Sequence, residues 1–333
     1  MWINIVAVLL AVSLASCQKT PSENPTPITP GPLKKITLSY TTQPESTLLH
    51  VAIAKGYFTE EGLETTSLIA PFGKAALQMV LENKADFAAA AETPFMFSVL
   101  KGEKLFVIAN IDQTSTNHAI VARRDAGISE RGELAGKRIG FTPGTTGDFF
   151  LDSMLTVKGI ARSDIQPVPL KPDEMLEAIV TNKVDAVSTW NYPLARIQQQ
   201  LGTNGVLLID RQIYTEIFNV MAQQKFVQEN PETVKSFLRA LIKAESFVKQ
   251  HKDEAQVLYS KATNTDLNLV RPVWGEFSYH VNLDNTLIIT LEDETRWAIK
   301  NKLTDQVVAP DYRNYIHVDS LKAVSPTTVT FNH

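Results

Sequence analysis

The sequence of 333 residues contains one cysteine, Cys17, which lies so near the start that none remains for a metal site in the rest of the chain. Neither charge is in large excess: 32 Lys and Arg against 36 Asp and Glu give a net charge of −4, without a basic run that would suit nucleic acid. The six histidines lack the spacing of a zinc motif, and no Gly-x-Ser-x-Gly nucleophile motif occurs. We therefore expect no metal, no cofactor and no nucleic-acid partner.

Long apolar runs are also missing, apart from residues 5–14, which are too few to span a bilayer as a helix. The run ends at Leu14-Ala-Ser-Cys17, which resembles a bacterial lipoprotein signal, in which the cysteine is diacylated and becomes the new N-terminus. One departure is that residues 2–4 contain no Lys or Arg. The resemblance implies a signal peptide over residues 1–16, a lipid anchor on Cys17 and an extracytoplasmic location.

Residues 17–33 contain the lipidated cysteine and then five prolines among Ser, Thr and Asn, with too little apolar matter to fold. Such a segment is semi-extended. We expect it to tether the folded body to the membrane surface.

The remaining chain of about 300 residues is longer than a single hydrophobic core usually serves, and 44% of the sequence is apolar. Short apolar runs alternate with amphipathic ones, which predicts parallel sheets flanked by helices. We therefore predict an α/β protein with two lobes. Beyond residue 210 the pattern becomes mainly helical, with one helix at 231–250, after Asn230 as a cap, and another that opens at Thr290.

The expected elements of the two lobes are short. The predicted strands are 35–40, 63–69, 87–90, 106–110, 120–123, 138–141, 165–167, 186–189 and 206–209, and the predicted helices are 47–55, 74–82, 94–101, 148–158, 173–182 and 193–201.

An internal repeat supports two lobes of one design. Leu77 to Asp86 and Leu176 to Asp185 both end in Asn-Lys-x-Asp, and each is followed eight residues later by a proline, Pro94 or Pro193. Each motif predicts the end of a helix, then a buried strand, then a helix started by the proline. The segment 35–41 also resembles 137–142, so polar turns are expected after both of these strands.

The turn after the strand at 138–141 has the composition of an anion cradle. Gly144 and Gly147 let the backbone approach a ligand, Thr145 and Thr146 supply hydroxyls, and a helix start supplies partial positive charge. The same residues also fit a plain capping box, Thr145 with Asp148, which would only start a helix. Because ligands bind at the carboxyl ends of parallel strands, we expect this turn and residues 41–46 to face one cleft.

The chain resembles the substrate-binding proteins of ABC importers in the sulfonate/nitrate/taurine class, a family that includes binding proteins for thiamine-pyrimidine precursors. The resemblance covers residues 35–316 and rests on segments 54–63, 140–147, 182–190, 230–239 and 311–316. It implies a two-lobed clamshell of the type II-like periplasmic-binding-protein fold, with lobe one at 34–122 and 216–333, including C-terminal helices, and lobe two at 123–215. It places the connecting strands near 120–124 and 214–222. A monomeric receptor without enzymatic activity, acting with a permease and an ATPase, is then expected.

Two departures from the family concern the ligand. The chain has Ala91-Glu92 where many relatives have small residues with Gly, and Trp190-Asn-Tyr-Pro193 where they often have Trp-Glu-Pro. A cleft carboxylate at Glu92 would favour a ligand with a cationic or N–H-donating end. The alternative is that Glu92 is a loop residue whose side chain contacts only water. Trp190 could stack on a ligand or fill the core between the lobes. The predicted ligand-binding residues are Gln43, Glu92, Thr93, Thr142, Gly144, Thr145, Thr146, Trp190 and Asn191.

These residues predict binding of a small sulfonate, taurine-like or related solute, with a thiamine-pyrimidine precursor as the alternative. Two other classes of function stay open. An enzyme of thiamine-pyrimidine synthesis would need a reactive histidine in the cleft, for which only His50 and His118 lie near a predicted strand end. A lipoprotein that senses a ligand without importing it would lack neighbouring permease and ATPase genes.

Overall fold

The computed structural model describes residues 32–129 and 133–331, and this part of the chain forms one compact unit. The predicted signal peptide, the anchor Cys17 and most of the tether lie outside the described residues. Over the ranges that are described, no helix has both the length and the apolar character needed to cross a membrane.

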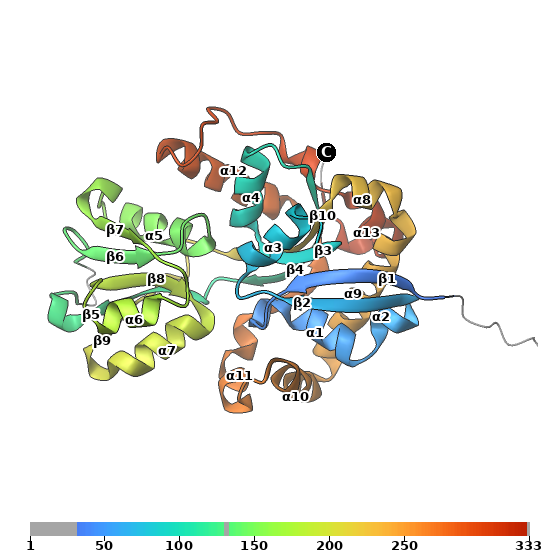
Figure 1. Ribbon diagram of the computed structural model, residues 1–333, viewed down its shortest axis with the longest axis horizontal. Helices are drawn as coiled ribbons and strands as arrows, with labels where there is room; N and C mark the ends of the chain where they lie inside the picture. The colour runs from blue at the N-terminus through green and yellow to red at the C-terminus, as the bar shows by residue number, and fades with distance from the viewer. Residues whose placement is uncertain (1–31, 130–132, 332–333) are drawn as a thin grey trace, which may run out of the picture. The chain divides into compact units, whose positions relative to one another are not determined.

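Two sheets organise the molecule (Figure 1). The first has the order β11-β4-β10-β3-β1-β2 and consists of β1 (Lys34–Tyr40), β2 (Leu63–Ile69), β3 (Phe87–Ala91), β4 (Leu105–Thr114), β10 (Glu216–Gln223) and β11 (Ser278–Asn282). The second has the order β7-β6-β8-β5-β9 and consists of β5 (His118–Arg123), β6 (Arg138–Phe141), β7 (Gln166–Pro169), β8 (Ala186–Trp190) and β9 (Gly205–Leu208).

The repeat seen in the sequence appears as a repeat of strand order. The series β2-β1-β3-β10-β4 of lobe one corresponds strand by strand to β7-β6-β8-β5-β9 of lobe two. The prediction of parallel sheets holds for three strands of each lobe, whereas β10 and β5 run antiparallel to both neighbours. These two strands enter each sheet from the other lobe, so they run in the opposite direction.

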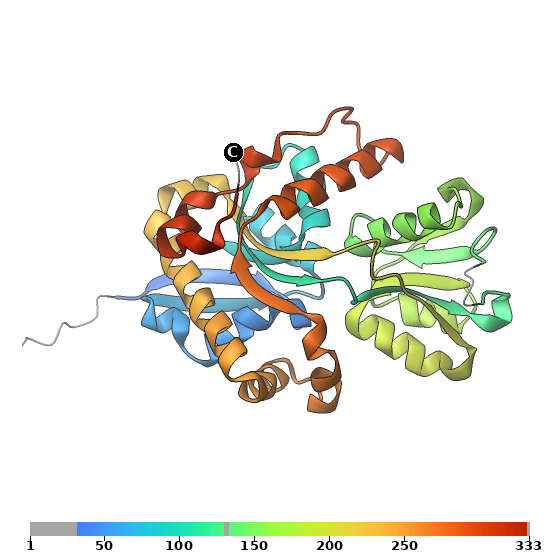
Figure 2. The same cartoon turned by 180° about the vertical axis from the view of Figure 1, so that it is seen from behind.

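The chain crosses between the lobes twice, from β4 to β5 and from β9 to β10 (Figure 2). All of β5 pairs with β8 and β9, so residues 118–122 belong to the second sheet and the first crossing lies at 115–117, a few residues before the expected place. The second crossing lies between Leu208 and Glu216.

The repeated Asn-Lys-x-Asp motif has one physical role in both lobes. Its asparagines, Asn83 and Asn182, have positive φ angles of 57° and 62°, a conformation that ends a helix and that asparagine tolerates well. Its aspartates then accept a backbone N–H from the neighbouring strand, Asp86 Oδ2 from Thr37 at 2.7 Å and Asp185 Oδ2 from Arg138 at 2.9 Å. The motif therefore connects the end of each helix to the strand at the centre of the parallel part of its sheet, β1 or β6.

The helices follow the strands as the sequence predicted, with shifted starts. Lobe one has α1 (Thr47–Ala54), α2 (Tyr57–Glu60), α3 (Gly73–Leu81) and α4 (Glu92–Leu100), and lobe two has α5 (Thr146–Val157), α6 (Met175–Val180) and α7 (Asn191–Leu201). Pro94 and Pro193 are the third residues of α4 and α7, not the first. A proline fits there because no N–H of the first turn has an intrahelical acceptor.

The C-terminal part consists of α8 (Gln224–Glu229), α9 (Pro231–Gln250), α10 (Lys252–Thr263), α11 (Leu267–Val273), α12 (Asn285–Lys300) and α13 (Val318–Val324). Helix α9 begins with Pro231 as predicted, but the Asn230 side chain does not cap it. Helix α12 begins five residues before Thr290, because Asp284 accepts the N–H of Thr286 at 2.8 Å and so starts the helix there.

Hydrophobic packing differs between the lobes. In lobe one a single core joins the sheet to the C-terminal helices, and Phe237 of α9 stacks on Phe87 and Phe58 with ring centroids 4.2 and 5.2 Å apart. In lobe two the two faces of the sheet bury separate clusters, because neighbouring residues of a strand point to opposite faces: Ile120 packs in one cluster and Val121 in the other.

Candidate functional site

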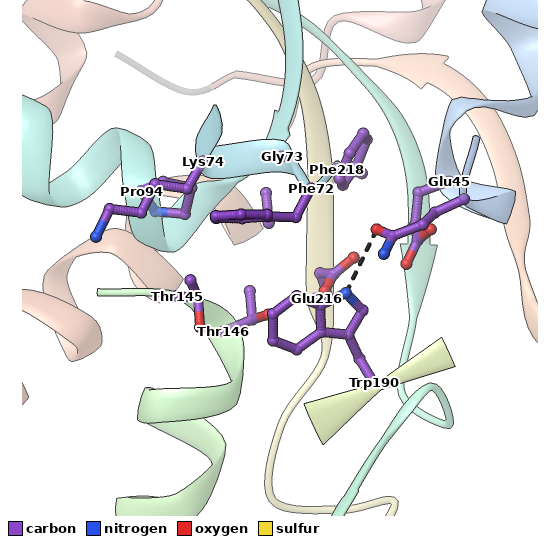
Figure 3. A pocket seen from close by; sticks show the side chains of 12 residues that line it. Glu45, Phe72, Gly73, Lys74, Pro94, Thr145, Thr146, Trp190, Glu216 and Phe218 are labelled. Atoms are coloured by element: carbon purple, nitrogen blue, oxygen red, sulfur yellow. Dashed lines mark hydrogen bonds between the residues drawn. The ribbon is translucent and has the colours of Figure 1, made fainter. Parts of the chain in front are cut away.

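The strand ends of both sheets enclose a small cavity of about 20 Å³, which is room for about one water molecule. The residues that line it come from both lobes (Figure 3): Gln43, Glu45, Phe72, Gly73, Lys74, Ala91, Pro94, Thr145, Thr146, Trp190, Glu216 and Phe218. Four of the predicted site residues are among them, namely Gln43, Thr145, Thr146 and Trp190. The structure therefore brings these four together from segments far apart in the sequence.

Trp190 closes one wall of the cavity. It is the last residue of β8, and its indole N–H donates to Gln43 Oε1 of lobe one at 3.3 Å, the bond drawn dashed in Figure 3. A Cβ at Gly147 would lie 3.0 Å from the Trp190 ring, so the glycine allows the ring to pack closely against α5. Trp190 thus fills space between the lobes and also lines the cavity.

The Gly/Thr turn before α5 is held by its own hydrogen bonds. Thr145 precedes the helix, but its hydroxyl donates to Thr142 O at 2.7 Å and does not cap the helix. Asp148 Oδ2 accepts the N–H of Gly144 at 2.9 Å, and Gly144 needs its positive φ of 65°. Thr142 donates to Leu170 O at 2.9 Å. Thr142 and Gly144 shape the turn without lining the cavity of Figure 3.

His118, the first residue of β5, fixes the direction of the Thr146 hydroxyl. The Asn117 amide nitrogen donates to Glu45, so its oxygen, 2.6 Å from His118 Nδ1, accepts the proton of that ring nitrogen. His118 Nε2 then accepts from Thr146 Oγ1 at 2.7 Å. Burial lowers the pKa of His118 to about 3, which keeps the ring neutral.

Glu92 does not line the cavity, in contrast to the expectation from the sequence. It is fully buried at the start of α4, where its carboxylate accepts the Tyr214 hydroxyl and the N–H of Ile217 at 2.9 Å. Burial raises the pKa of Glu92 to about 7. Thr93 is also buried and donates to Glu294. Both residues attach α4 to neighbouring elements and do not point into the cavity.

Two carboxylates that the sequence reasoning missed do line the cavity. Glu45 lies in the short 3-10 helix Pro44–Ser46, inside the turn that the repeat had indicated, and Glu216 is the first residue of β10. The amide of Asn191, a predicted site residue that is not in this lining, donates to Glu45 Oε1. Glu45 could have been found from its place in the 41–46 turn, whereas no motif surrounds Glu216.

Another group of residues that the sequence did not predict lies after β2. Phe72 faces the cavity from the side opposite Trp190, and Lys74 lies near Thr145 (Figure 3). The Lys74 ammonium reaches across to lobe two and donates to Pro143 O at 2.7 Å. Burial, followed by the charge of Lys101, lowers the pKa of Lys74. These residues follow the carboxyl end of a parallel strand, where ligands bind in such sheets. The same rule that indicated the two repeated turns could therefore have indicated them.

A further contact joins the lobes away from the cavity. The indole N–H of Trp297 in α12 donates to Asp152 Oδ2 of α5 at 2.6 Å, and Arg162 pairs with both Asp148 and Asp152 at 2.9 and 2.5 Å. Within residues 32–129 and 133–331, no group of three or more His, Cys, Asp or Glu is placed to hold a metal ion.

Comparison with known proteins agrees with this arrangement. A Bacillus subtilis protein named as an aliphatic sulfonates-binding protein is 27% identical over 68% of this chain and 69% of its own. The formylaminopyrimidine-binding protein of Halalkalibacterium halodurans is 23% identical over 82% of this chain and 83% of its own. The crystal structure of the periplasmic aliphatic sulphonate binding protein SsuA from Escherichia coli has the same fold, with a TM-score of 0.72 at 16% identity over 86% of this chain and 98% of that one.

These matches confirm the resemblance seen in the sequence. The family model described as NMT1/THI5 like matches residues 43–255, which is more than half of the chain. The chain therefore belongs to the NMT1/THI5-like family.

Proposed function

We propose that this protein is the extracytoplasmic solute-binding component of an ABC importer, which closes its lobes over a small molecule and delivers it to a permease that an ATPase drives. The observation that carries the proposal is the cavity lined by strand ends of both lobes, with hydrogen bonds that join the lobes on either side of it. Two relatives are named as binding proteins, which supports a receptor rather than an enzyme, as the sequence predicted.

The sequence predicts a small sulfonate or taurine-like solute, and one end of the cavity suits its oxyanion. Thr145 and Thr146 place the start of the 12-residue helix α5 at the cavity wall, and the first N–H groups of a helix have no intrahelical acceptor. The ammonium of Lys74 lies at the same end. The named ligand of the Bacillus subtilis relative belongs to the same chemical class.

A thiamine-pyrimidine precursor is the second candidate, and the aromatic walls favour it. The rings of Phe72 and Trp190 face the cavity from opposite sides, where a flat heterocycle would stack. The Halalkalibacterium halodurans relative is named for a formylaminopyrimidine.

A thermal-shift screen of the mature protein, freed of co-purified ligand by unfolding and refolding, tests the receptor function. A ligand that binds only the folded state raises stability as RT ln(1 + [L]/Kd), about 2.7 kcal/mol at 100 Kd. We expect one class among sulfonates, nitrate, amines, pyrimidines and small organic acids to raise the melting temperature. A flat response to all classes would contradict the proposal.

The double substitution Thr145→Ala with Thr146→Ala separates the two ligand classes. It loosens the turn before α5 and should weaken an oxyanion ligand by about 1 to 3 kcal/mol, because hydrogen bonds to a charged group are lost or displaced. A neutral heterocycle stacked on Trp190 should keep its affinity. Equal loss for both classes would show that the turn supports only the fold.

We also propose that the mature chain is anchored by a lipid on Cys17 and stands off the membrane on the Pro-rich tether. The support is the apolar run that ends at Cys17 and the five prolines after it. Cys17→Ser should release the intact body into the soluble fraction or leave the signal uncleaved. A variant that is processed normally and stays on the membrane would exclude the lipid as the anchor.

A further inference from the structure

Glu45 and Glu216 approach the cavity from different parts of lobe one. Glu45 precedes α1, and Glu216 starts the strand that returns from lobe two. Both line the cavity although they are only 1% and 3% exposed, and Figure 3 shows Glu216 between Glu45 on one side and Thr145 with Lys74 on the other. They are buried acids whose carboxylates lie at the cavity wall.

Each of these side chains has a carboxyl oxygen without an amide or hydroxyl partner among the described residues, Oε2 of Glu45 and Oε1 of Glu216, and the two carboxyl groups lie within hydrogen-bond reach of each other. Glu45 Oε1 accepts from the amides of Asn117 and Asn191, which leaves only Oε2. Glu216 Oε2 lies 3.4 Å from His118 Nε2, but that nitrogen already accepts from Thr146 and has no proton to donate. Buried carboxylate oxygens without partners carry a large desolvation cost, which a cation or N–H donor in the cavity would relieve.

No basic side chain offsets the two acids at this end of the cavity. Among the described residues that line it, only Lys74 is basic, and its ammonium is bonded to Pro143 O at the other end. Burial, and then the charges of Glu45, Glu92 and Asp112, raise the pKa of Glu216 well above its ordinary value. The protein thus places two buried acids beside each other at the cavity wall, which is typical of a site that a ligand completes.

We propose that Glu45 and Glu216 form a cation subsite that binds an ammonium or amidinium group of the transported solute. This inference rests on the proposed receptor function and specifies its ligand. The rings of Phe72 and Trp190 add faces that attract a cation in the same cavity. A solute that also carries an acidic group would place it toward Lys74 and the start of α5. A plain sulfonate or nitrate offers these two acids neither a positive charge nor an N–H donor.

Two pairs of probes with nearly the same shape but different charge test the subsite. Taurine is compared with isethionate, in which a hydroxyl replaces the ammonium, and benzamidinium is compared with the neutral benzamide. Calorimetric titration of the refolded mature protein should show that the cationic member of at least one pair binds about 10 to 100 times more tightly, as expected for a charged hydrogen bond. Glu45→Gln and Glu216→Gln should each reduce this preference, and the double variant should abolish it.

Glu294→Gln is the matched control. Glu294 is also a fully buried carboxyl of lobe one, but it does not line the cavity. The control should keep the preference for the cation. Preference for the neutral or anionic member, or a cation preference that survives the double variant, would overturn the subsite. Binding of a solute from the screen without any binding of either cationic probe would overturn the subsite and leave the receptor function intact, whereas no binding at all would contradict both.

A measurement without ligand separates a binding role from a structural one. Because burial beside other acids disfavours the charged form of Glu216, this carboxyl costs the folded protein stability at pH 8, and Glu216→Gln should raise the melting temperature there by a few degrees. If Glu216 served the fold, for example by holding His118, its neutral variant would melt at a lower temperature. A lower melting temperature would therefore also overturn the proposal.

Discussion

The two lobes share a strand order but contribute opposite chemistry to the cavity. Lobe one supplies charge, through Glu45, Glu216 and Lys74, whereas lobe two supplies the hydroxyls of Thr145 and Thr146 and the indole of Trp190. The corresponding strand ends thus lie at equivalent places while their residues differ in kind. The repeated strand order therefore determines where a ligand can bind, and the residues just beyond the strand ends determine which ligand binds.

The largest expected effect on stability comes from substitutions in the hydrophobic cores of the two lobes. Phe237→Ala in lobe one should cost about 3 to 5 kcal/mol of unfolding free energy, and Leu151→Ala in lobe two about 2 to 5, because both side chains are fully buried. Since the two belong to separate hydrophobic clusters, each substitution should lower hydrogen-exchange protection mainly in its own lobe. Equal loss of protection in both lobes after either substitution would show that the lobes unfold as one unit.

An intermediate effect should come from the buried acids of lobe one and depend on pH. The pKa of Glu92 is raised to about 7 in the folded protein, so its contribution to stability is complete below pH about 4.5 and is lost as the pH rises through 7. Relative to the wild type, Glu92→Gln should therefore gain about 1 to 3 kcal/mol between pH 5 and pH 8 in denaturant unfolding. His118 titrates in both proteins and cancels in this difference. A difference that stays constant over this range would contradict the buried, neutral Glu92.

The smallest effect concerns the repeated aspartates. Asp185 accepts from the Arg138 guanidinium at 2.6 and 3.1 Å as well as from a backbone N–H, whereas Asp86 accepts the backbone N–H of Thr37. Asp185→Asn should thus cost about 0.2 to 1 kcal/mol more than Asp86→Asn, since the guanidinium is partly exposed. Adding Arg138→Gln should remove the difference, and a larger cost at Asp86 would refute the assignment.

The sequence predicted most of the frame because the frame depends on local patterns. The Asn-Lys-x-Asp repeat determines where α3 and α6 end, and Pro231 starts α9 in both the prediction and the structure. The errors have local causes as well. Asp284 competes with Thr290 as the start of α12, and the strands next to the crossings run antiparallel because they arrive from the other lobe.

The sequence predicted cavity residues only at the ends of the strands that the internal repeat indicates. Gln43, Thr145, Thr146 and Trp190 lie at or just after the ends of repeated strands and line the cavity. Glu92 is one residue past the end of β3 but bonds to Tyr214 in the second crossing instead. Glu216 enters the cavity because the chain returns from lobe two at that residue. Such a position depends on a contact between segments about 170 residues apart, Glu45 and Glu216, for which a single sequence contains no pattern.

The two tryptophans that join the lobes give the protein a built-in optical reporter. Trp190 and Trp297 each bury an indole and donate its N–H to the opposite lobe, whereas Trp274 packs against Tyr259 and Tyr279 inside lobe one. Separation of the lobes would transfer the first two indoles from protein to water and shift their fluorescence to longer wavelength, while Trp274 would keep its emission as an internal reference. The rate of solute binding can thus be measured on the unlabelled protein. Trp297→Phe would leave Trp190, in the cavity wall, as the indole whose fluorescence changes when the lobes move.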